Sequence, residues 1–514
     1  MKRVVVVGGG VAGLAAALGI RDRAQARGVP IEVRVVEANA RPGGNLRTER
    51  DDGFTIERGP NGFLDNVPAT LDLVRRIGLE GELQPADALA AKRFLFRHGR
   101  LHELRASPLG FLASPLLSWR GRARVLGEPW TRPRAGSRAG LDETVHAFAA
   151  RHLGEEAAHV LVGAMVAGVF GGDSRQLSLA SAFPKMAAME EGHGSLVRAM
   201  LAKAKERRAA KRRLAELRAR GEDAPELERP GGPAGPGGTL TSFRGGIETL
   251  VDALVRALPG AVETGRAADW LGRHPVAGGG SPWRVMLRDG GELDADAVVV
   301  AIPAGPAAPL LGPLDRELGD AVAAIPSAGL AVIALGFDAA AFDERGGAPR
   351  GFGFLAPRGE GLRILGCLWD SSIFPGRAPA GKVLVRAMIG GALDPEALHL
   401  SDGELVHAVR EDLRRAMGLG VEPERVWVYR HALGISQYTV GHGARLAAIE
   451  CALERLPGLY VAGQSYYGIA MNAAIESAGR IAERVVDGLE KTGDSLRISN
   501  LPESEQPATL SANP

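Results

Sequence analysis

The chain has 514 residues, of which 45% are hydrophobic and 24% charged, and its formal net charge is +2. This balance is ordinary for a folded protein and excludes a chain that is disordered over most of its length. Its two cysteines exclude a disulfide scaffold and a cysteine-based zinc module, and its length predicts several lobes. We find no uninterrupted apolar run of about 18 residues, which argues against a membrane-spanning helix, and the apolar run at the N-terminus is too short for a signal peptide.

The first elements form a βαβ unit. Lys2–Val7 is a β-branched run typical of a buried strand, and Leu14–Ala26 is an alanine-rich helix. A second strand, Glu32–Val36, ends at Glu37. A unit of this kind predicts parallel strands joined by a right-handed crossover.

The turn between the first strand and its helix carries the spacing Gly8-x-Gly10-x-x-Gly13. Such glycines allow a tight turn, close approach of a pyrophosphate and close packing of helix on strand. Glu37 follows at the end of the second strand, where a carboxylate can accept hydrogen bonds from both ribose hydroxyls. The pattern predicts a dinucleotide site; the alternative is a glycine-rich turn without a ligand.

The middle of the chain is basic and predicted to be helical. Segment 104–134 mixes Trp, Leu and Phe with arginines, and helical patterns cover 142–170 and 174–220. Between Arg198 and Arg220 there are ten Lys or Arg and two Glu, with apolar residues on one helical face. This arrangement suits the headgroups of an anionic membrane, the alternative being a solvated charged helix. Aromatic residues do not interleave with the basic ones, which disfavours nucleic-acid binding.

The chain then returns to the first lobe. The later predicted elements are a loop at 231–238, a helix at Ile247–Leu258, a buried strand at Asp296–Pro303, alternating strands and helices over 304–440, a strand at Leu459–Gly463, a helix at Ile475–Leu489 and a disordered tail after Lys491. We find no metal-ligand spacing among the histidines and therefore predict no metal site.

Two further glycine-rich stretches point to flavin. The extended dinucleotide motif of FAD oxidases is similar to two stretches here, Arg41-x-Gly43-Gly44 and Glu57-x-Gly59-Pro60-Asn61. In this motif Arg41 can contact the diphosphate. Near the other end, Gly463 and the run Gly468–Asn472 before a helix resemble the C-terminal FAD segment of the same enzymes. A helix N-terminus there would stabilise the anionic reduced flavin.

With these ends in place, the sequence resembles the protoporphyrinogen IX oxidases over residues 3–488. The stretches that carry the resemblance are Arg41–Gly44, Glu57–Asn61, Ala91–Leu95, Gly168–Asp173, Ser242–Gly246, Gly351–Leu355, Met388–Gly391 and Gln437–His442. The resemblance implies FAD as cofactor and a tetrapyrrole substrate. It implies that Arg93 pairs with a substrate propionate, a role that also suits a guanidinium physically.

The remaining site residues also follow from the resemblance. The carbonyl of Gly168 is expected to face the pyrrole N–H groups, and Phe352, Leu355 and Met388 to form apolar walls around the macrocycle. No side chain is nominated as a catalytic acid or base. The cofactor-binding residues are expected to be Gly8, Gly9, Gly10, Val11, Ala12, Gly13, Glu37, Ala38, Arg41, Gly44, Asn45, Gly59, Pro60, Asn61, Gly62, Ala268, Gly463, Ile469, Ala470 and Met471. One departure is Asn472-Ala473-Ala474, where many relatives have Asn-Asp-Cys.

The expected fold is α/β: a doubly wound FAD-binding lobe, an α+β substrate lobe and a mainly helical membrane-associating lobe. The expected division is FAD-binding for 1–95, 239–303 and 441–490, helical for 96–238, substrate-binding for 304–440, and a disordered tail over 491–514. The implied reaction is three two-electron oxidations of protoporphyrinogen IX to protoporphyrin IX, with O₂ reoxidising FAD and giving H₂O₂.

Several alternatives stay open. Within the family, the substrate can instead be coproporphyrinogen III, whose four carboxylates favour a more basic pocket mouth. Two other classes are a flavin amine oxidase, which needs an aromatic cage such as Tyr466 and Tyr467 could begin, and a non-catalytic protein like the GDP-dissociation inhibitors. The expected location is cytoplasmic, at the inner face of the cell membrane, with a homodimer and a ferrochelatase as further candidate partners.

Overall fold

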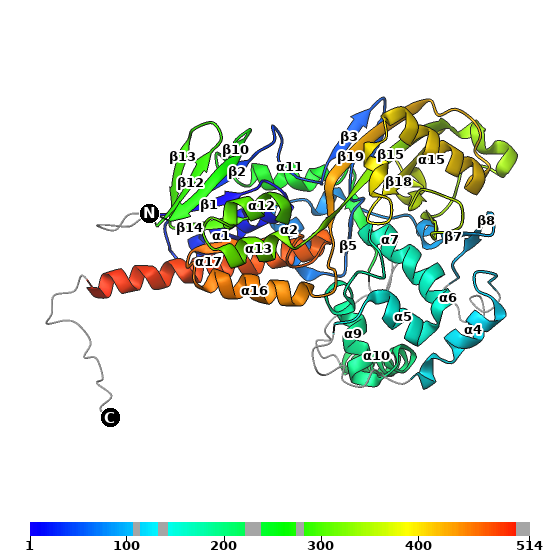
Figure 1. Ribbon diagram of the computed structural model, residues 1–514, viewed down its shortest axis with the longest axis horizontal. Helices are drawn as coiled ribbons and strands as arrows, with labels where there is room; N and C mark the ends of the chain where they lie inside the picture. The colour runs from blue at the N-terminus through cyan, green and yellow to red at the C-terminus, as the bar shows by residue number, and fades with distance from the viewer. Residues whose placement is uncertain (106–113, 132–141, 221–237, 274–281, 500–514) are drawn as a thin grey trace.

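A computed structural model describes residues 1–105, 114–131, 142–220, 238–273 and 282–499. Figure 1 shows three regions: a sheet flanked by helices at the left, a larger sheet at the upper right and a group of helices at the lower right. The apolar part of segment 104–134 that includes Leu109, Phe111 and Leu112 lies outside the described residues, as does nearly all of the loop expected at 231–238.

The first sheet is parallel and is built from three separate stretches of chain. Its strand order is β10 (Val262–Thr264), β2 (Ile31–Glu37), β1 (Lys2–Val7), β14 (Ala297–Val300) and β20 (Leu459–Val461). The expected βαβ unit is confirmed. The valines of β1 are buried on both sides, as a strand covered on both faces requires.

Helices cover both faces of this sheet. One face carries α1 (Val11–Ala26), α2 (Pro68–Arg76), α11 (Glu248–Arg256) and α17 (Met471–Ser499). The other carries α12 (Ala304–Leu311), α13 (Arg316–Ala323), α16 (His442–Glu454) and the antiparallel sheet β11 (Ala268–Arg273), β12 (Trp283–Leu287) and β13 (Glu292–Ala295). The alanines and glycines of α1 let it lie between the sheet and α17 with most of its surface buried.

The second sheet has seven strands and carries the other half of the candidate site. Its order is β19 (Arg425–Ser436), β15 (Ser327–Asp338), β18 (Lys382–Gly390), β17 (Gly366–Leu368), β16 (Gly353–Leu355), β7 (Arg93–Arg97) and β8 (Arg100–Glu103). Helix α15 (Asp402–Met417) packs on one face. A capping box between Ser401 and Glu404 begins this helix and Gly418 ends it, at a φ of 69°.

Two small sheets join the regions. They are the hairpin β3 (Thr48–Asp51) and β4 (Phe54–Glu57), and the three strands β5 (Phe63–Leu64), β9 (Leu240–Phe243) and β6 (Leu83–Pro85). They place the segment 57–62 between the parallel sheet and the seven-stranded sheet.

The third region is helical. It contains α4 (Trp119–Leu126), the turn Glu128–Trp130, α5 (Val145–Leu153), α6 (Glu155–Ala157), a π-helical turn (Ala158–Gly163), α7 (Ala164–Phe170), α8 (Leu179–Ala182), α9 (Pro184–His193) and α10 (Leu196–Ala219). The two expected helical patterns are thus divided at glycines and at Pro184. Among the described helices, none combines the length and the apolar character needed to span a bilayer.

Three expectations about the chain differ from the structure. The seven-stranded sheet is not confined to 304–440, because the hairpin β7–β8 pairs with β16 at its edge. Residues 304–325 pack on the parallel sheet instead. The tail was expected to be disordered from residue 491, but α17 continues to Ser499; residues 500–514 lie outside the described part.

Candidate functional site

The turn after β1 has the geometry that a bound diphosphate requires. A Cβ built on Gly13 would lie 2.0 Å from the carbonyl oxygen of Gly8, so only glycine lets α1 approach the turn this closely. A Cβ on Gly10 would meet nothing within 4 Å. The turn therefore has open space in front of the α1 N-terminus, where free N–H groups and the helix dipole favour an anion.

Other predicted cofactor residues gather around this turn. Glu37 is buried and accepts a hydrogen bond of 2.8 Å from the backbone N–H of Gly9. The N–H of Gly43 donates to the carbonyl of Gly9 at 2.8 Å, which lays the second glycine-rich loop over the first. The N–H of Arg266 donates to the carbonyl of Glu37, which brings the start of β11, and with it Ala268, to the same edge.

The remaining predicted cofactor segments approach from two sides. A Cβ on Gly59 would lie 2.4 Å from the carbonyl oxygen of Asn45, so these two loops touch. Gly463 follows β20 by two residues and lies beside Ala12, with 3.9 Å between a Cβ built on the glycine and the alanine Cβ. Met471 begins α17, as expected of a helix N-terminus at the C-terminal segment. Arg41 and Ala38 are exposed at the rim.

This arrangement fits FAD. The open side of Gly10, the carboxylate at the end of β2 and the start of α17 provide places for diphosphate, ribose and ring at one locus. Asn61 Oδ1 and one terminal nitrogen of Arg386 are buried and have no hydrogen-bond partner within the described residues. A polar group bound there would satisfy both.

Three of the predicted substrate residues, Arg93, Leu355 and Met388, share one face of the seven-stranded sheet. Two adjacent rows of directly paired residues run across four strands: Arg93, Gly353, Leu368 and Arg386 in one, and Leu95, Leu355, Gly366 and Met388 in the other. Since the rows are two residues apart on every strand, their side chains point to the same side of the sheet. The opposite side bears Phe354, Cys367 and Ala387, which are fully buried under α15.

On β16, β17 and β18 the two faces differ in burial. On the candidate face Leu355, Leu368 and Met388 are only half-buried, and Phe352, just before β16, is half-buried as well. The guanidinium of Arg93 stacks over the Phe352 ring, with 5.0 Å between its carbon and the ring centroid. Burial lowers the pKa of Arg93. The face thus offers an apolar surface with a cation at one edge.

Helix α7 links the substrate face to the cofactor segments. A Cβ on Gly168 would lie 2.3 Å from a methyl carbon of Leu355, so the glycine lets the helix backbone reach the sheet. On the same helix, Val166 and Phe170 belong to an apolar cluster against which Ile469 packs. The predicted carbonyl contact of Gly168 stays a prediction.

Tyr438 and the adjacent His442 hold the C-terminal cofactor loop. The sequence indicates them only as part of the stretch Gln437–His442. The Tyr438 hydroxyl donates to the carbonyl of Gln464 at 2.5 Å and accepts from the N–H of Gly468 at 2.7 Å. Its ring stacks on His442, with centroids 4.0 Å apart. Burial, with a smaller effect of Arg445, lowers the pKa of His442 to about 4, so this histidine is neutral near pH 7.

The neutral state of His442 predicts an acid-sensitive fold. The unfolded chain takes up a proton at this residue near pH 6.5, while the folded chain resists protonation until about pH 4. The free energy of unfolding should therefore fall by about 3 kcal/mol as the pH drops through this window. Urea unfolding of the wild type and of His442→Phe, which keeps a ring against Tyr438, measures the difference. Equal pH dependence of the two proteins would contradict the assignment.

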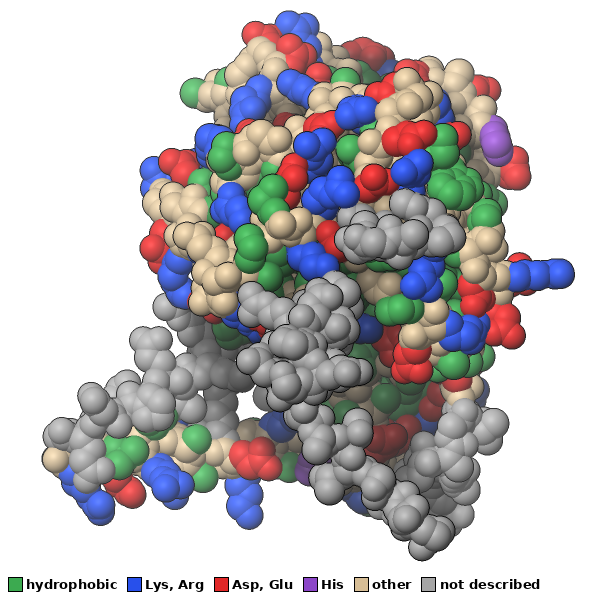
Figure 2. Space-filling model, turned by 90° about the vertical axis from the view of Figure 1, so that its left-hand side faces the viewer, with side chains coloured by type: hydrophobic (Ala, Val, Ile, Leu, Met, Phe, Trp, Pro, Cys, Tyr) green, Lys and Arg blue, Asp and Glu red, His purple; other side chains and the backbone are tan. Residues whose placement is uncertain are grey.

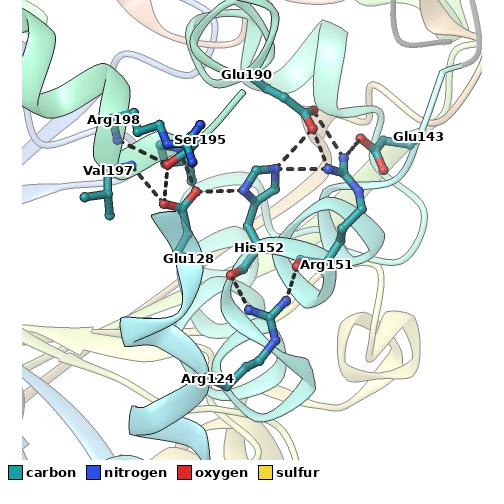
Figure 3. A network of polar contacts seen from close by, with 10 residues as sticks. Arg124, Glu128, Glu143, Arg151, His152, Glu190, Ser195, Val197 and Arg198 are labelled. Atoms are coloured by element: carbon teal, nitrogen blue, oxygen red, sulfur yellow. Dashed lines mark hydrogen bonds and ion pairs between the residues drawn. The ribbon is translucent and has the colours of Figure 1, made fainter. Parts of the chain in front are cut away.

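In the helical region, a buried network fixes the start of α10 (Figure 3). Glu128 accepts hydrogen bonds from the Ser195 hydroxyl and from the N–H groups of Leu196 and Val197, at 2.7 to 3.0 Å. His152 lies between Glu128 and Glu190, at 2.8 and 3.2 Å. Burial opposes ionisation of Glu128, but these hydrogen bonds outweigh it and hold its pKa below the ordinary value.

The same region carries a patch of exposed apolar side chains next to basic ones. Trp119 and Trp130 are 72% and 78% exposed, and Met200 and Leu201 on the first turns of α10 are 54% and 65% exposed. In Figure 2, Lys and Arg side chains lie along the helix that projects at the lower edge of the molecule. Within the described residues no cluster of histidine, cysteine or carboxylate side chains could hold a metal ion.

The chain is similar in sequence to known proteins over nearly its whole length. Residues 11–486 match the family described as flavin containing amine oxidoreductase. A coproporphyrinogen III oxidase of Bacillus subtilis is 30% identical over 488 residues, covering 92% of this chain and 96% of the relative. A protoporphyrinogen oxidase of Bos taurus is 34% identical over 513 residues, covering 94% and 98%.

A solved structure also has a similar fold. A protein from Exiguobacterium sp. 255-15, provisionally named a protoporphyrinogen oxidase, superposes with a TM-score of 0.77 at 25% identity, covering 95% of this chain and 99% of that one. The chain belongs to the flavin containing amine oxidoreductase family. It is an oxidoreductase, and its cofactor is FAD.

Proposed function

We propose that this protein oxidises protoporphyrinogen IX to protoporphyrin IX, with O₂ as the electron acceptor and H₂O₂ as the by-product. The observation that carries the proposal is the half-buried apolar face of the seven-stranded sheet, with Arg93 at its edge and the flavin loops beside it. A puckered tetrapyrrole with two propionates has the matching chemistry. The two relatives are named for the oxidation of coproporphyrinogen III and of protoporphyrinogen.

In this proposal the chain acts by binding and orientation. Bound FAD supplies the two-electron acceptor for each of three oxidations and passes the electrons to O₂. Phe352, Leu355 and Met388 hold the macrocycle on the sheet and exclude water, while Arg93 fixes its rotation through a propionate. Proximity and orientation of this kind can lower a barrier by about 7–11 kcal/mol. No side chain is needed as acid or base.

The cofactor roles are proposed residue by residue. The backbone of Gly8–Gly13 receives the diphosphate, with Arg41 and Gly44 at its rim. Glu37 receives the ribose, and Ala38 and Ala268 border the same end. Asn45, Gly59, Pro60, Asn61, Gly62, Gly463, Ile469, Ala470 and Met471 surround the ribityl chain and ring. Gly168 completes the substrate side from α7.

The direct test is anaerobic mixing of the flavin-loaded protein with protoporphyrinogen IX. Loss of the flavin absorbance, followed by its return and by porphyrin fluorescence when O₂ is admitted, is the expected result. A parallel reaction with coproporphyrinogen III tests the alternative that the Bacillus subtilis relative suggests. Unchanged flavin absorbance with both porphyrinogens would overturn the proposal.

We also propose that the protein lies peripherally on an anionic membrane, at its cytoplasmic face. Trp119, Trp130, Met200 and Leu201 supply apolar insertion, and the lysines and arginines of α10 supply attraction to anionic headgroups. The buried hydrogen bonds of Glu128 support this, because they hold the turn that bears Trp130 against the start of α10. Homodimerisation and contact with a ferrochelatase stay predictions from the resemblance.

Trp119→Ala combined with Trp130→Ala should lower the fraction bound to anionic vesicles at least fivefold. Each exposed indole contributes about 1–2 kcal/mol of apolar burial when it enters the interface. Sedimentation with phosphatidylglycerol-containing vesicles measures the bound fraction. Trp270→Ala is the matched control, since Trp270 is 42% exposed on β11 in a different region. Equal binding of all three proteins would contradict this surface.

A further inference from the structure

A buried arginine connects the substrate face to a flavin loop. Arg386 on β18 is 2% exposed, and its Nε donates to Asp370 Oδ2 at 2.9 Å. One of its terminal nitrogens donates to the carbonyl oxygens of Glu57 and Gly59, at 2.6 Å each. Its planar fork therefore serves a carboxylate and two backbone acceptors at once, which suits guanidinium geometry.

Asp370 holds the other end of the same loop. It begins α14 (Asp370–Ile373), is buried, and accepts a hydrogen bond of 3.0 Å from Asn61 Nδ2. Arg386 and Asp370 thus fix the segment 57–61 at three positions. Beside them, Glu57 pairs with Arg377 at 3.0 Å. The two carboxylates and two guanidiniums carry opposite charges in equal number, and their attraction offsets the cost of removing all four from water.

We call the hydrogen bonds from Arg386 and Asp370 to residues 57–61 the brace. The position of Arg386 in the sheet connects this brace to the predicted substrate face. Arg386 lies in the same row as Arg93 and two residues before Met388 on the same face. One side chain therefore belongs to the predicted substrate face and grips the loop predicted to line the flavin. A movement of this loop relative to the sheet would change the distance between the two reacting molecules.

We propose that Arg386 is a positioning residue that sets the spacing between the flavin and the substrate, through Gly59 and Asn61. This inference rests on the proposed function. A shift of about 1 Å in the reacting geometry can cost on the order of a hundredfold in rate. Two of the three guanidinium nitrogens of Arg386 are engaged by Asp370 and by the carbonyls of Glu57 and Gly59. Arg386 therefore acts mainly through the loop, on the rate of electron transfer and only weakly on substrate affinity.

The test compares Arg386→Met and Arg386→Lys with the wild type. We expect the anaerobic rate of flavin reduction, expressed per bound FAD, to fall at least tenfold in Arg386→Met, and less in Arg386→Lys, which keeps the charge beside Asp370. The KM for porphyrinogen should stay within about threefold. The visible circular dichroism of the bound flavin should change in both variants, and this readout needs no turnover.

Arg97→Met is the matched control. Arg97 lies on β7 of the same sheet and pairs with Glu360 at 2.7 Å, both side chains being 14% exposed, without touching residues 57–61. Its loss should lower the melting temperature and leave the reduction rate per bound FAD unchanged. If the Arg386 variants behave like this control, the brace is only stabilising and the proposal is wrong.

An unfolded Arg386 variant and an inactive wild type each have a separate consequence. Where Arg386→Met does not fold, Asp370→Asn decides the question, because it keeps the shape of the pair and removes one charge; an unchanged rate and unchanged flavin dichroism would then overturn the proposal. A wild type that oxidises neither porphyrinogen defeats the proposed function instead. In that case the flavin dichroism and the FAD dissociation constant of the variants still test the brace.

Discussion

Gly13→Ala is expected to destabilise the apoprotein by about 3 kcal/mol and to abolish FAD binding. The new methyl carbon would lie 2.0 Å from the carbonyl oxygen of Gly8, which is backbone and cannot rotate away. Overpacking in a closely packed site typically costs 1–3 kcal/mol, and a clash with backbone belongs at the upper end. Chemical unfolding of the apoprotein and titration with FAD, followed by quenching of flavin fluorescence, measure the two effects.

Gly10→Ala is expected to change FAD binding without changing the stability of the fold. Gly10 has a φ of −71°, which alanine adopts freely, and its Cβ would meet no protein atom within 4 Å. The apoprotein should therefore unfold like the wild type, while the dissociation constant for FAD rises at least tenfold because the methyl occupies the diphosphate position. Wild-type FAD affinity in Gly10→Ala would show that the diphosphate binds elsewhere. Wild-type stability in Gly13→Ala would contradict the packing argument.

This contrast shows why the cofactor half could be predicted from the sequence. The turn Gly8–Gly13 and the strand end at Glu37 depend on short-range geometry, so residue type and spacing determine the local structure. The structure has both elements: β2 ends at Glu37 as expected, and α1 starts at Val11, three residues before the expected Leu14. The helix expected from Ile475 is also present as α17, which begins earlier, at Met471.

The substrate half could not be derived in this way. Arg93 and Met388 are almost 300 residues apart in the chain, and only the pairing of four strands brings them to one face. Phe352, Leu355 and Met388 look like ordinary strand core in the sequence, and the resemblance alone singled them out. Arg386 was missed because nothing in its local sequence distinguishes a buried brace from a surface arginine on an edge strand.

Arg93→Ala is expected to raise the KM for protoporphyrinogen IX by about 10- to 100-fold, with FAD affinity unchanged. A hydrogen-bonded ion pair to a carboxylate contributes about 1.5–3 kcal/mol, and every 1.4 kcal/mol is a factor of ten. Arg93→Lys should recover part of this, since an ammonium cannot form the bidentate contact. Steady-state kinetics gives the KM, and flavin fluorescence gives the FAD affinity. Arg100→Ala, at an exposed position on the neighbouring strand β8, should leave both constants unchanged.

The diester of the substrate identifies the partner of Arg93. Esterification removes the propionate charges, so the wild type should bind the diester about as weakly as Arg93→Ala binds the free acid. Arg93→Ala should discriminate little between acid and diester, because the interaction is already lost. The two changes are then strongly non-additive, as expected for groups in direct contact. Additive effects would mean that the propionates bind elsewhere and that Arg93 acts through its stacking on Phe352.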